Sequence, residues 1–218
     1  MLTLESFFLM VCILSLYFAY RGNGNNHRLL LSFVAWGALL GWIASTGFFQ
    51  QTDTLPPRPL LAVVPPTLLL IYFYRNQAPS PLALPWLLAI HTVRVPVELI
   101  LHQLYLRGDV PRLMTFVGWN YDILVGLSVI LILLYYWWQG ALPSRRFLLV
   151  WNGFGLLFLG IIVSLAVLSI PSPFQQLAFE QANRAVLIFP FTLLPGIIVP
   201  LVLLSHLRIF QLLREPET

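Results

Sequence analysis

The stretch that decides the fold is PWLLAIHTVRVPVELILHQLYL, residues 85–106. It is apolar enough and long enough to cross a bilayer, which takes about 20 residues. Yet it carries a row of histidine and charged residues at helical spacing, namely His91, Arg94, Glu98 and His102. Ionisable side chains are costly inside a membrane, so they are rare there unless packing or function requires them. The stretch therefore predicts a membrane helix with a polar site along it.

The polar residues of this stretch fall on one face of the predicted helix. At about 100° per residue, Arg94, Glu98 and His102 lie roughly −60°, −20° and +20° from His91. Tyr105 falls near −40° and extends the row. At about 1.5 Å per residue, the row from His91 to His102 is about 16 Å long, or about half of the hydrocarbon core. Because lipid would not tolerate such a face, we expect it to point into a helical bundle.

The composition is that of a membrane domain. Apolar residues make up 59% of the chain and charged residues 9%, whereas a soluble domain has about 25% charged residues. The 218 residues therefore form one transmembrane domain, 1–218, of the all-α class, with the lipid bilayer as partner. Short loops make consecutive helices antiparallel neighbours in one bundle. We expect seven spans, at about residues 4–20, 29–49, 60–74, 86–106, 116–138, 147–170 and 186–207.

The basic residues exclude some functions. All twelve are arginine, so the chain cannot hold retinal, which binds as a Schiff base on lysine. The arginines are scattered singly between spans, which favours topology signals over nucleic-acid binding. Apart from Arg94, which lies within a predicted span, seven lie on one side and four on the other, so the positive-inside rule predicts an outer N-terminus and a cytoplasmic C-terminus. The single cysteine, Cys12, excludes a disulfide framework.

The fifth span supplies a partner for the polar row. Asp122 stands between Gly118 and Gly126, and small residues at those positions allow another helix to approach closely. Counted from the short loop before it, Asp122 lies at the depth of the polar row. Asn120 lies at a similar depth but about 200° around the helix from Asp122. Both side chains therefore cannot face one cavity without a local distortion.

These residues favour a receptor or transporter with a buried polar pocket between the fourth and fifth spans, opening outward. The ligand would be a small molecule, an anion or a proton. Arg94 would hold the anion or balance the carboxylates, while Glu98 and His102 would exchange protons. The alternative is a structural bundle, in which the polar network only fixes helix packing. The predicted ligand-binding residues are Arg94, Glu98, His102 and Asp122, supported by His91 and Tyr105.

A metal site is another alternative. His102, Glu98 and Asp122 form a nitrogen and oxygen ligand set suited to zinc. Intramembrane hydrolases use histidine and aspartate with zinc-activated water, so this alternative makes the chain an intramembrane metal-dependent enzyme. The spacing matches no metal signature, however, and Arg94 nearby would oppose a cation.

A haem between two histidines on different helices is a further alternative. His91 and His206 stand at comparable depths towards the cytoplasmic side. Because His206 is near the end of the last span, we expect it to lie at the water interface instead. Asn152, beside Gly153 and Gly155 on the sixth span, is expected to be a packing residue.

Four segments carry a resemblance to known proteins. They are HTVRVPVELIL (91–101), WNYDIL (119–124), SPFQQLAFEQANRAV (172–186) and PFTLLPGIIVPLVLLSHL (190–207). In these segments the chain resembles a family of uncharacterised bacterial multi-pass membrane proteins. The resemblance covers roughly residues 85–210 and implies a location in the bacterial cytoplasmic membrane. It implies no activity.

Overall fold

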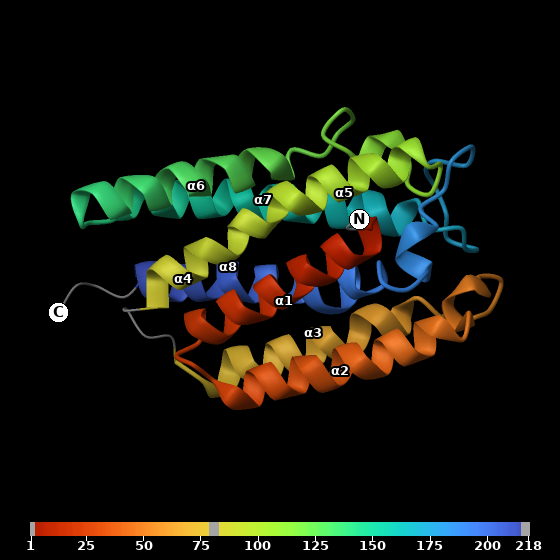
Figure 1. Ribbon diagram of the computed structural model, residues 1–218, viewed down its shortest axis with the longest axis horizontal. Helices are drawn as coiled ribbons and strands as arrows, with labels where there is room; N and C mark the ends of the chain where they lie inside the picture. Colours follow the sequence, from red (N-terminus) through yellow and green to blue (C-terminus); the bar gives the residue numbers. More distant parts are fainter. Residues whose placement is uncertain (1–2, 79–82, 215–218) are drawn as a thin grey trace.

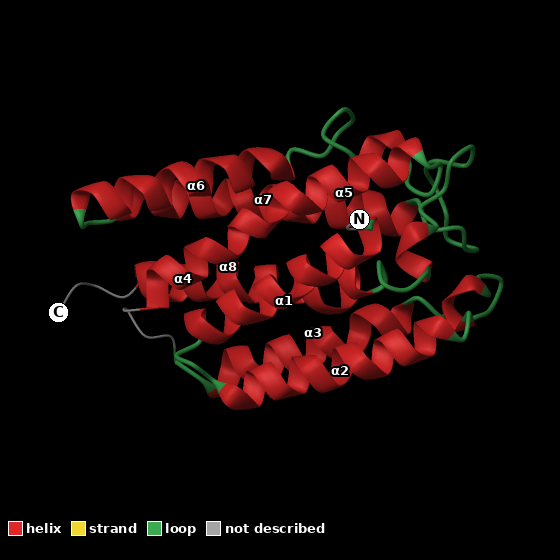
Figure 2. Ribbon diagram, in the orientation of Figure 1, coloured by secondary structure: helices red, strands yellow, loops and turns green. Residues whose placement is uncertain are grey.

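The computed structural model describes residues 3–78 and 83–214, and these residues form helices and loops without strands (Figure 2). The predicted all-α class is therefore confirmed for them. Six helical segments are long and apolar enough to cross a membrane, and α3 is a shorter apolar helix. These helices indicate an integral membrane protein. The main helices are α1 (Leu4–Gly22), α2 (His27–Ser45), α3 (Leu60–Asn76), α4 (Leu84–Ala89), α5 (Arg94–Leu106), α6 (Asp122–Gln139), α7 (Arg145–Leu168) and α8 (Val199–Arg214).

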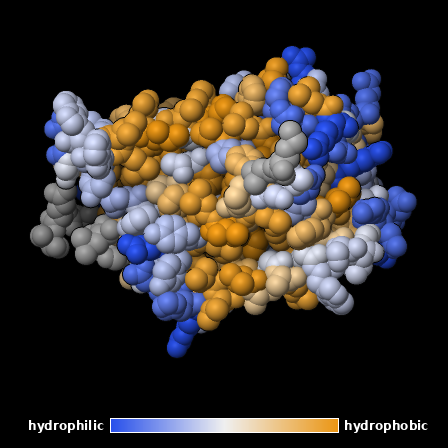
Figure 3. Space-filling view, in the orientation of Figure 1, coloured by the Kyte–Doolittle hydropathy of each residue, from blue (hydrophilic) through white to orange (hydrophobic). Residues whose placement is uncertain are grey.

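The helices run roughly along the long axis of the molecule (Figure 1). Helices α2 and α3 pack together along one edge, and α6 and α7 along the opposite edge. Helix α8 lies between the two pairs and packs against α1, α3, α4 and α7. A broad apolar band covers the middle of the visible face, and hydrophilic residues gather towards its ends (Figure 3). This distribution fits a bundle whose middle faces lipid.

The segment that contains the polar row is one continuous helical rod with a tightened turn in its centre. Helices α4 and α5 are joined by the 3₁₀ segment η3 (Ile90–Val93). Pro96 lies just beyond this segment and has no N–H to donate to the carbonyl of Thr92, which explains why the helix changes its winding here. A 3₁₀ turn has about three residues, so His91 and Arg94 keep nearly the same side of the rod. Both side chains are buried, as the predicted polar face requires.

The fifth span begins later than predicted. Helix α6 starts at Asp122 rather than near residue 116, and a loop with the short 3₁₀ turn η4 (Arg112–Met114) precedes it. Backbone hydrogen bonds close this loop, among them one of 2.8 Å from Gly118 to Thr115. A Cβ at Gly118 would come within 2.3 Å of the carbonyl oxygen of Arg112. The prediction that Gly118 serves a helix contact is therefore wrong, because this glycine permits a tight loop.

The last helical segment is irregular at its start. It was predicted from residue 186, but residues 185–187 form a 3₁₀ turn and a π-helical turn, η6 (Leu194–Ile198), leads into α8. Pro195 and Pro200 flank the start of α8, and proline removes a backbone donor wherever it enters a helix. The helix then continues to Arg214, seven residues beyond the predicted end at 207.

Arg208 of α8 holds the end of α3 in place. Its side chain is 1% exposed, and its guanidinium donates to the carbonyl oxygens of Phe73 at 2.7 Å and Gln77 at 2.5 Å. The last carbonyls of a helix have no partner within the helix and carry its partial negative charge. Arg208 satisfies both needs at once, which joins α3 to the central helix.

Replacing Arg208 with leucine is expected to lower the unfolding free energy by about 3 kcal/mol, because buried carbonyls at the end of α3 lose a charged donor. Thermal or denaturant unfolding of the purified protein measures this effect. Arg214→Leu is the matched control, since Arg214 is on the same helix and is exposed. Equal stability of the two variants would contradict this role of Arg208.

Candidate functional site

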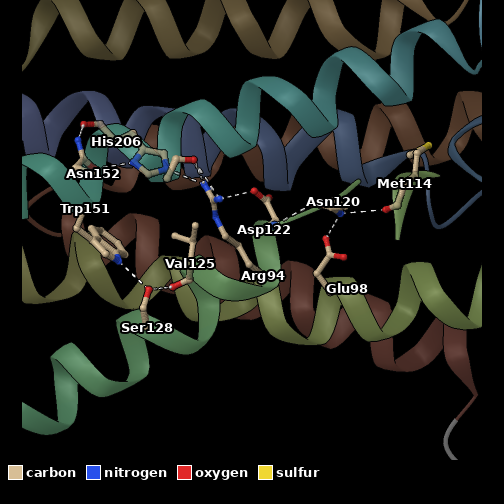
Figure 4. A network of polar contacts seen from close by, with 11 residues as sticks. Arg94, Glu98, Met114, Asn120, Asp122, Val125, Ser128, Trp151, Asn152 and His206 are labelled. Carbon is tan, nitrogen blue, oxygen red and sulfur yellow. Dashed lines mark hydrogen bonds and ion pairs between the residues drawn. The ribbon is translucent and has the colours of Figure 1, made fainter. Parts of the chain in front are cut away.

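The centre of the site is the guanidinium of Arg94, at the start of α5. The residue is 3% exposed. Its Nη1 donates to Oδ1 of Asp122 at 2.7 Å, and its Nη2 donates to Nε2 of His206 at 2.7 Å. Both Nη atoms also lie 3.3 Å from the carbonyl oxygen of Gly155. One side chain thereby connects α5 with α6, α7 and α8 (Figure 4).

Two glycines let these helices come close enough for the contacts to form. A Cβ at Gly126 of α6 would lie 2.7 Å from Cγ2 of Val95. A Cβ at Gly155 of α7 would lie 2.6 Å from Cε1 of His206. Real side chains do not tolerate such distances, so α6 and α7 can approach Arg94 only because both positions are glycine. The predicted close approach at Gly126 is confirmed.

The hydrogen bonds of His206 fix its tautomer. Arginine has donors only, so Nε2 of His206 accepts from Arg94 and carries no proton. Its Nδ1 then carries the proton and donates to Oδ1 of Asn152 at 2.7 Å. The amide nitrogen of Asn152 donates in turn to the backbone carbonyl of His206 at 3.0 Å. His206 is therefore a neutral acceptor held in place by Asn152.

Glu98 forms the second half of the site, about one turn further along α5. It is 1% exposed, and its Oε1 accepts from the amide nitrogen of Asn120. That amide nitrogen also donates to the carbonyl oxygen of Met114 at 3.0 Å. Oε2 of Glu98 is buried and has no hydrogen-bond partner among the described residues. A buried carboxylate oxygen in this state costs free energy unless something else satisfies it.

Asn120 and Asp122 both belong to the site, and the late start of α6 explains how. Asn120 precedes the helix, so its direction does not follow helical spacing. Its Oδ1 accepts from the backbone N–H of Asp122 at 3.1 Å, while its amide reaches Glu98 (Figure 4). The distortion that both side chains need is thus the loop before α6. The predicted pairing of Arg94 with Asp122 is present, whereas Arg94 and Glu98 form no ion pair in the described residues.

In the described residues, the side chains of the rest of the predicted row form no hydrogen bond with this network. His102 packs its ring 4.8 Å from the ring of Phe116, and Tyr105 lies beside it at 6.0 Å. His91 is fully buried, and neither of its ring nitrogens has a partner in the part of the chain that is described. Its ring stands 4.2 Å from that of His206. The row therefore divides into a central pair, Arg94 and Glu98, and flanking aromatic contacts.

The two cofactor sites considered as alternatives are not assembled in the described part of the chain. Within residues 3–78 and 83–214, no three His, Cys, Asp or Glu side chains are grouped closely enough to hold a metal ion. The proposed ligands are separated because Asp122 turns to Arg94, Glu98 to Asn120 and His102 to an aromatic ring.

The haem interpretation fails for a different reason. The rings of His91 and His206 are in contact at 4.2 Å, which leaves no room for a porphyrin between them. Both nitrogens of His206 are already hydrogen-bonded. The expectation that His206 lies at the water interface is also wrong, because it is fully buried. The sequence does contain an indication of its role. Asn152 and Gly155 are three residues apart, so they share one face of their helix, and this is the face that contacts His206.

A cavity of about 450 Å³ adjoins the site. It lies among α3, α5, α7 and the η6–α8 segment, and most of its lining is apolar. Arg94, Glu98 and Asp122 are the ionisable residues in the lining. This volume falls within the range of small-molecule sites, which are mostly apolar with a few placed polar groups. This mostly apolar space differs from the polar pocket expected between the fourth and fifth spans. Of the six predicted ligand-binding residues, Arg94, Glu98 and Asp122 line it, whereas His91, His102 and Tyr105 do not.

Comparisons with protein-family models, with curated proteins and with solved structures gave no match for this chain. The chemistry of the site therefore rests on its own residues.

Replacing Asp122 with asparagine is expected to lower the unfolding free energy by about 3 to 5 kcal/mol, because it leaves the charge of Arg94 buried without a carboxylate. The double change Arg94→Met with Asp122→Leu is expected to restore at least half of the loss, since both charges are then removed. Denaturant unfolding in detergent measures both. A double variant less stable than Asp122→Asn would contradict the pairing.

Proposed function

We propose that this chain is an integral membrane receptor or transporter that binds a small ligand in the cavity beside Glu98. The observation that carries the proposal is Oε2 of Glu98, a buried oxygen that has no hydrogen-bond partner among the described residues and belongs to a residue that lines a mostly apolar cavity. Ligand sites commonly have this design, in which an apolar enclosure binds the body of the ligand and one polar group orients it.

The two halves of the polar row have different roles in this proposal. The Nη groups of Arg94 are occupied by Asp122, Gly155 and His206, so Arg94 holds four helical segments together rather than an external anion. Its charge is matched by that of Asp122. Glu98 is then a second carboxyl group without a charge partner, and a proton or a ligand has to compensate it. Proton exchange at Glu98 remains part of the proposal.

The irregular last span supports a role that involves movement. Leu194, Pro195 and Pro200 belong to the cavity lining, so the π-helical turn borders the ligand space. Such turns occur frequently at functional sites, and transporters use interrupted helices to form their binding sites. A transporter or a receptor that changes conformation on binding can therefore use this segment as its adjustable part.

The proposal places the chain across the membrane seven times, with α3 as the additional crossing. Its 17 residues correspond to about 26 Å, close to the hydrocarbon thickness. The first and last helices have their free ends at opposite ends of the bundle (Figure 1), as an odd number of crossings requires. The arginines that are not buried are more numerous at one end of the bundle, with Arg21, Arg28, Arg75, Arg145, Arg146 and Arg214 there and Arg58, Arg107, Arg112 and Arg184 at the other end. This supports a cytoplasmic C-terminus in a bacterial cytoplasmic membrane.

A purely structural bundle is the competing function, and the properties of Glu98 distinguish it from a ligand-binding protein. In a network that only fixes packing, a buried oxygen without a hydrogen-bond donor would lower stability and bring no benefit. Glu98→Gln retains an oxygen that can accept from Asn120, so it is expected to leave the unfolding free energy nearly unchanged. The same change alters the group that faces the ligand.

The test is mass spectrometry of the intact protein, purified in mild detergent, to detect small molecules that remain bound. The wild-type chain and Glu180→Gln, a control at an exposed loop position, are expected to retain the same bound molecule. Glu98→Gln is expected to lose it while keeping its melting temperature. If no molecule is retained and Glu98→Gln melts at a much lower temperature, the structural bundle is the better account.

A further inference from the structure

The cavity beside Glu98 has its opening on the side of the bundle. Val63 of α3 and both Gly160 and Val167 of α7 line the cavity and are exposed. Helices α3 and α7 each pack against α8, and they are not main packing neighbours of each other. The gap between them is therefore bounded by two helices and has α8 at its base. This gap provides an entrance on the side of the bundle.

The surroundings of this entrance are apolar. Val167 is 51% exposed, and Leu68 of α3 and Leu157 of α7 are exposed side chains on the same two helices. Such residues on helices that cross a membrane face the lipid chains. A molecule that uses this entrance therefore comes from the hydrocarbon region of the bilayer, and it must be soluble there.

The polar atoms inside the cavity call for a donor on the ligand. Oε2 of Glu98 accepts hydrogen bonds and has no partner among the described residues. Asn183, which also lines the cavity, has a buried Oδ1 without a partner in the same part of the chain. Both atoms are acceptors when Glu98 is ionised. The third buried atom on a lining residue that has no partner among the described residues is Nε of Arg94, a donor that belongs to the balanced Arg94–Asp122 pair. A ligand that offers only acceptors, such as a carboxylate, would leave the two acceptors unsatisfied.

The charges in the cavity determine which donor group on the ligand fits best. Arg94 and Asp122 lie 2.7 Å apart and balance each other, so an ionised Glu98 leaves one negative charge in excess. An ammonium group supplies both the donor and the compensating charge. An alcohol supplies only the donor, and an acid adds a second negative charge beside the first.

We infer that the cavity takes a lipophilic amine, a molecule with an apolar body and one protonatable nitrogen, which enters between α3 and α7. The nitrogen lies at Oε2 of Glu98, and the apolar body extends along α7 and α8 towards the entrance. This inference names the ligand class of the site and rests on the proposed function.

The first test compares three probes with the same chain and different head groups: dodecylamine, dodecanol and dodecanoic acid. Their binding to the wild-type protein in nanodiscs is measured against empty nanodiscs of the same lipid, which corrects for partition into the bilayer. Dodecylamine is expected to bind about tenfold more tightly than dodecanol, as a charge-assisted hydrogen bond implies. Glu98→Gln is expected to remove this preference, and Glu180→Gln to retain it. Binding of dodecanoic acid that equals or exceeds that of the amine would overturn the inference.

The second test concerns the entrance and uses two glycines of α7. A Cβ at either Gly160 or Gly153 meets no atom within 4 Å, and Gly160 lines the cavity whereas Gly153 does not. Gly160→Trp is therefore expected to weaken dodecylamine binding at least about tenfold by filling the entrance. Gly153→Trp, the matched control, is expected to bind as the wild type does. Equal binding by the two tryptophan variants would overturn lateral entry.

The results of these tests distinguish a failure of the amine inference from a failure of the proposed function. A purified protein that retains a bound small molecule through Glu98, yet shows no preference for dodecylamine, contradicts only the amine. A protein that retains no small molecule and binds none of the three probes contradicts the ligand-binding function as well.

Discussion

The bundle depends on the buried guanidinium of Arg94. A charged group inside a membrane protein must find partners within the protein, because lipid offers none. Arg94 finds them on three other helical segments, through Asp122, the carbonyl of Gly155 and a neutral His206. Each contact requires close approach, which explains the glycines on α6 and α7. The contact of Arg94 with His206 is thus one of those that position α8, and with it one wall of the cavity.

The same arrangement leaves Glu98 as the group that packing does not account for. Two carboxyl groups lie near one arginine, and Asp122 alone forms the ion pair. Glu98 is held by Asn120 through one oxygen, while the other has no partner among the described residues. A structural network and a binding site are therefore not exclusive in this molecule. One turn of α5 separates the residue that holds the helices from the residue that we propose contacts a ligand.

Much of the fold was predictable, because helical spacing and bilayer thickness are strong constraints. The common face of Arg94 and Glu98 and the depth of Asp122 followed from counting residues. The role of His206 did not, since it lies near the end of an apolar stretch and α8 extends further than hydropathy indicates. Asn120 was misplaced because the loop before α6 enters the bundle without helical winding. The cavity exists because α3 and α7 are separated in the bundle. This separation depends on the packing of several helices, so it cannot be predicted from any one segment.

The central claim is that Glu98, and not Asp122, responds to a ligand. The most direct measurement is the infrared difference spectrum of the protein in nanodiscs when dodecylamine is added, because carboxyl groups absorb separately from the backbone. The account predicts a change in one carboxyl group, which disappears in Glu98→Gln and is unaffected by Glu180→Gln. A difference signal that persists in Glu98→Gln would contradict it.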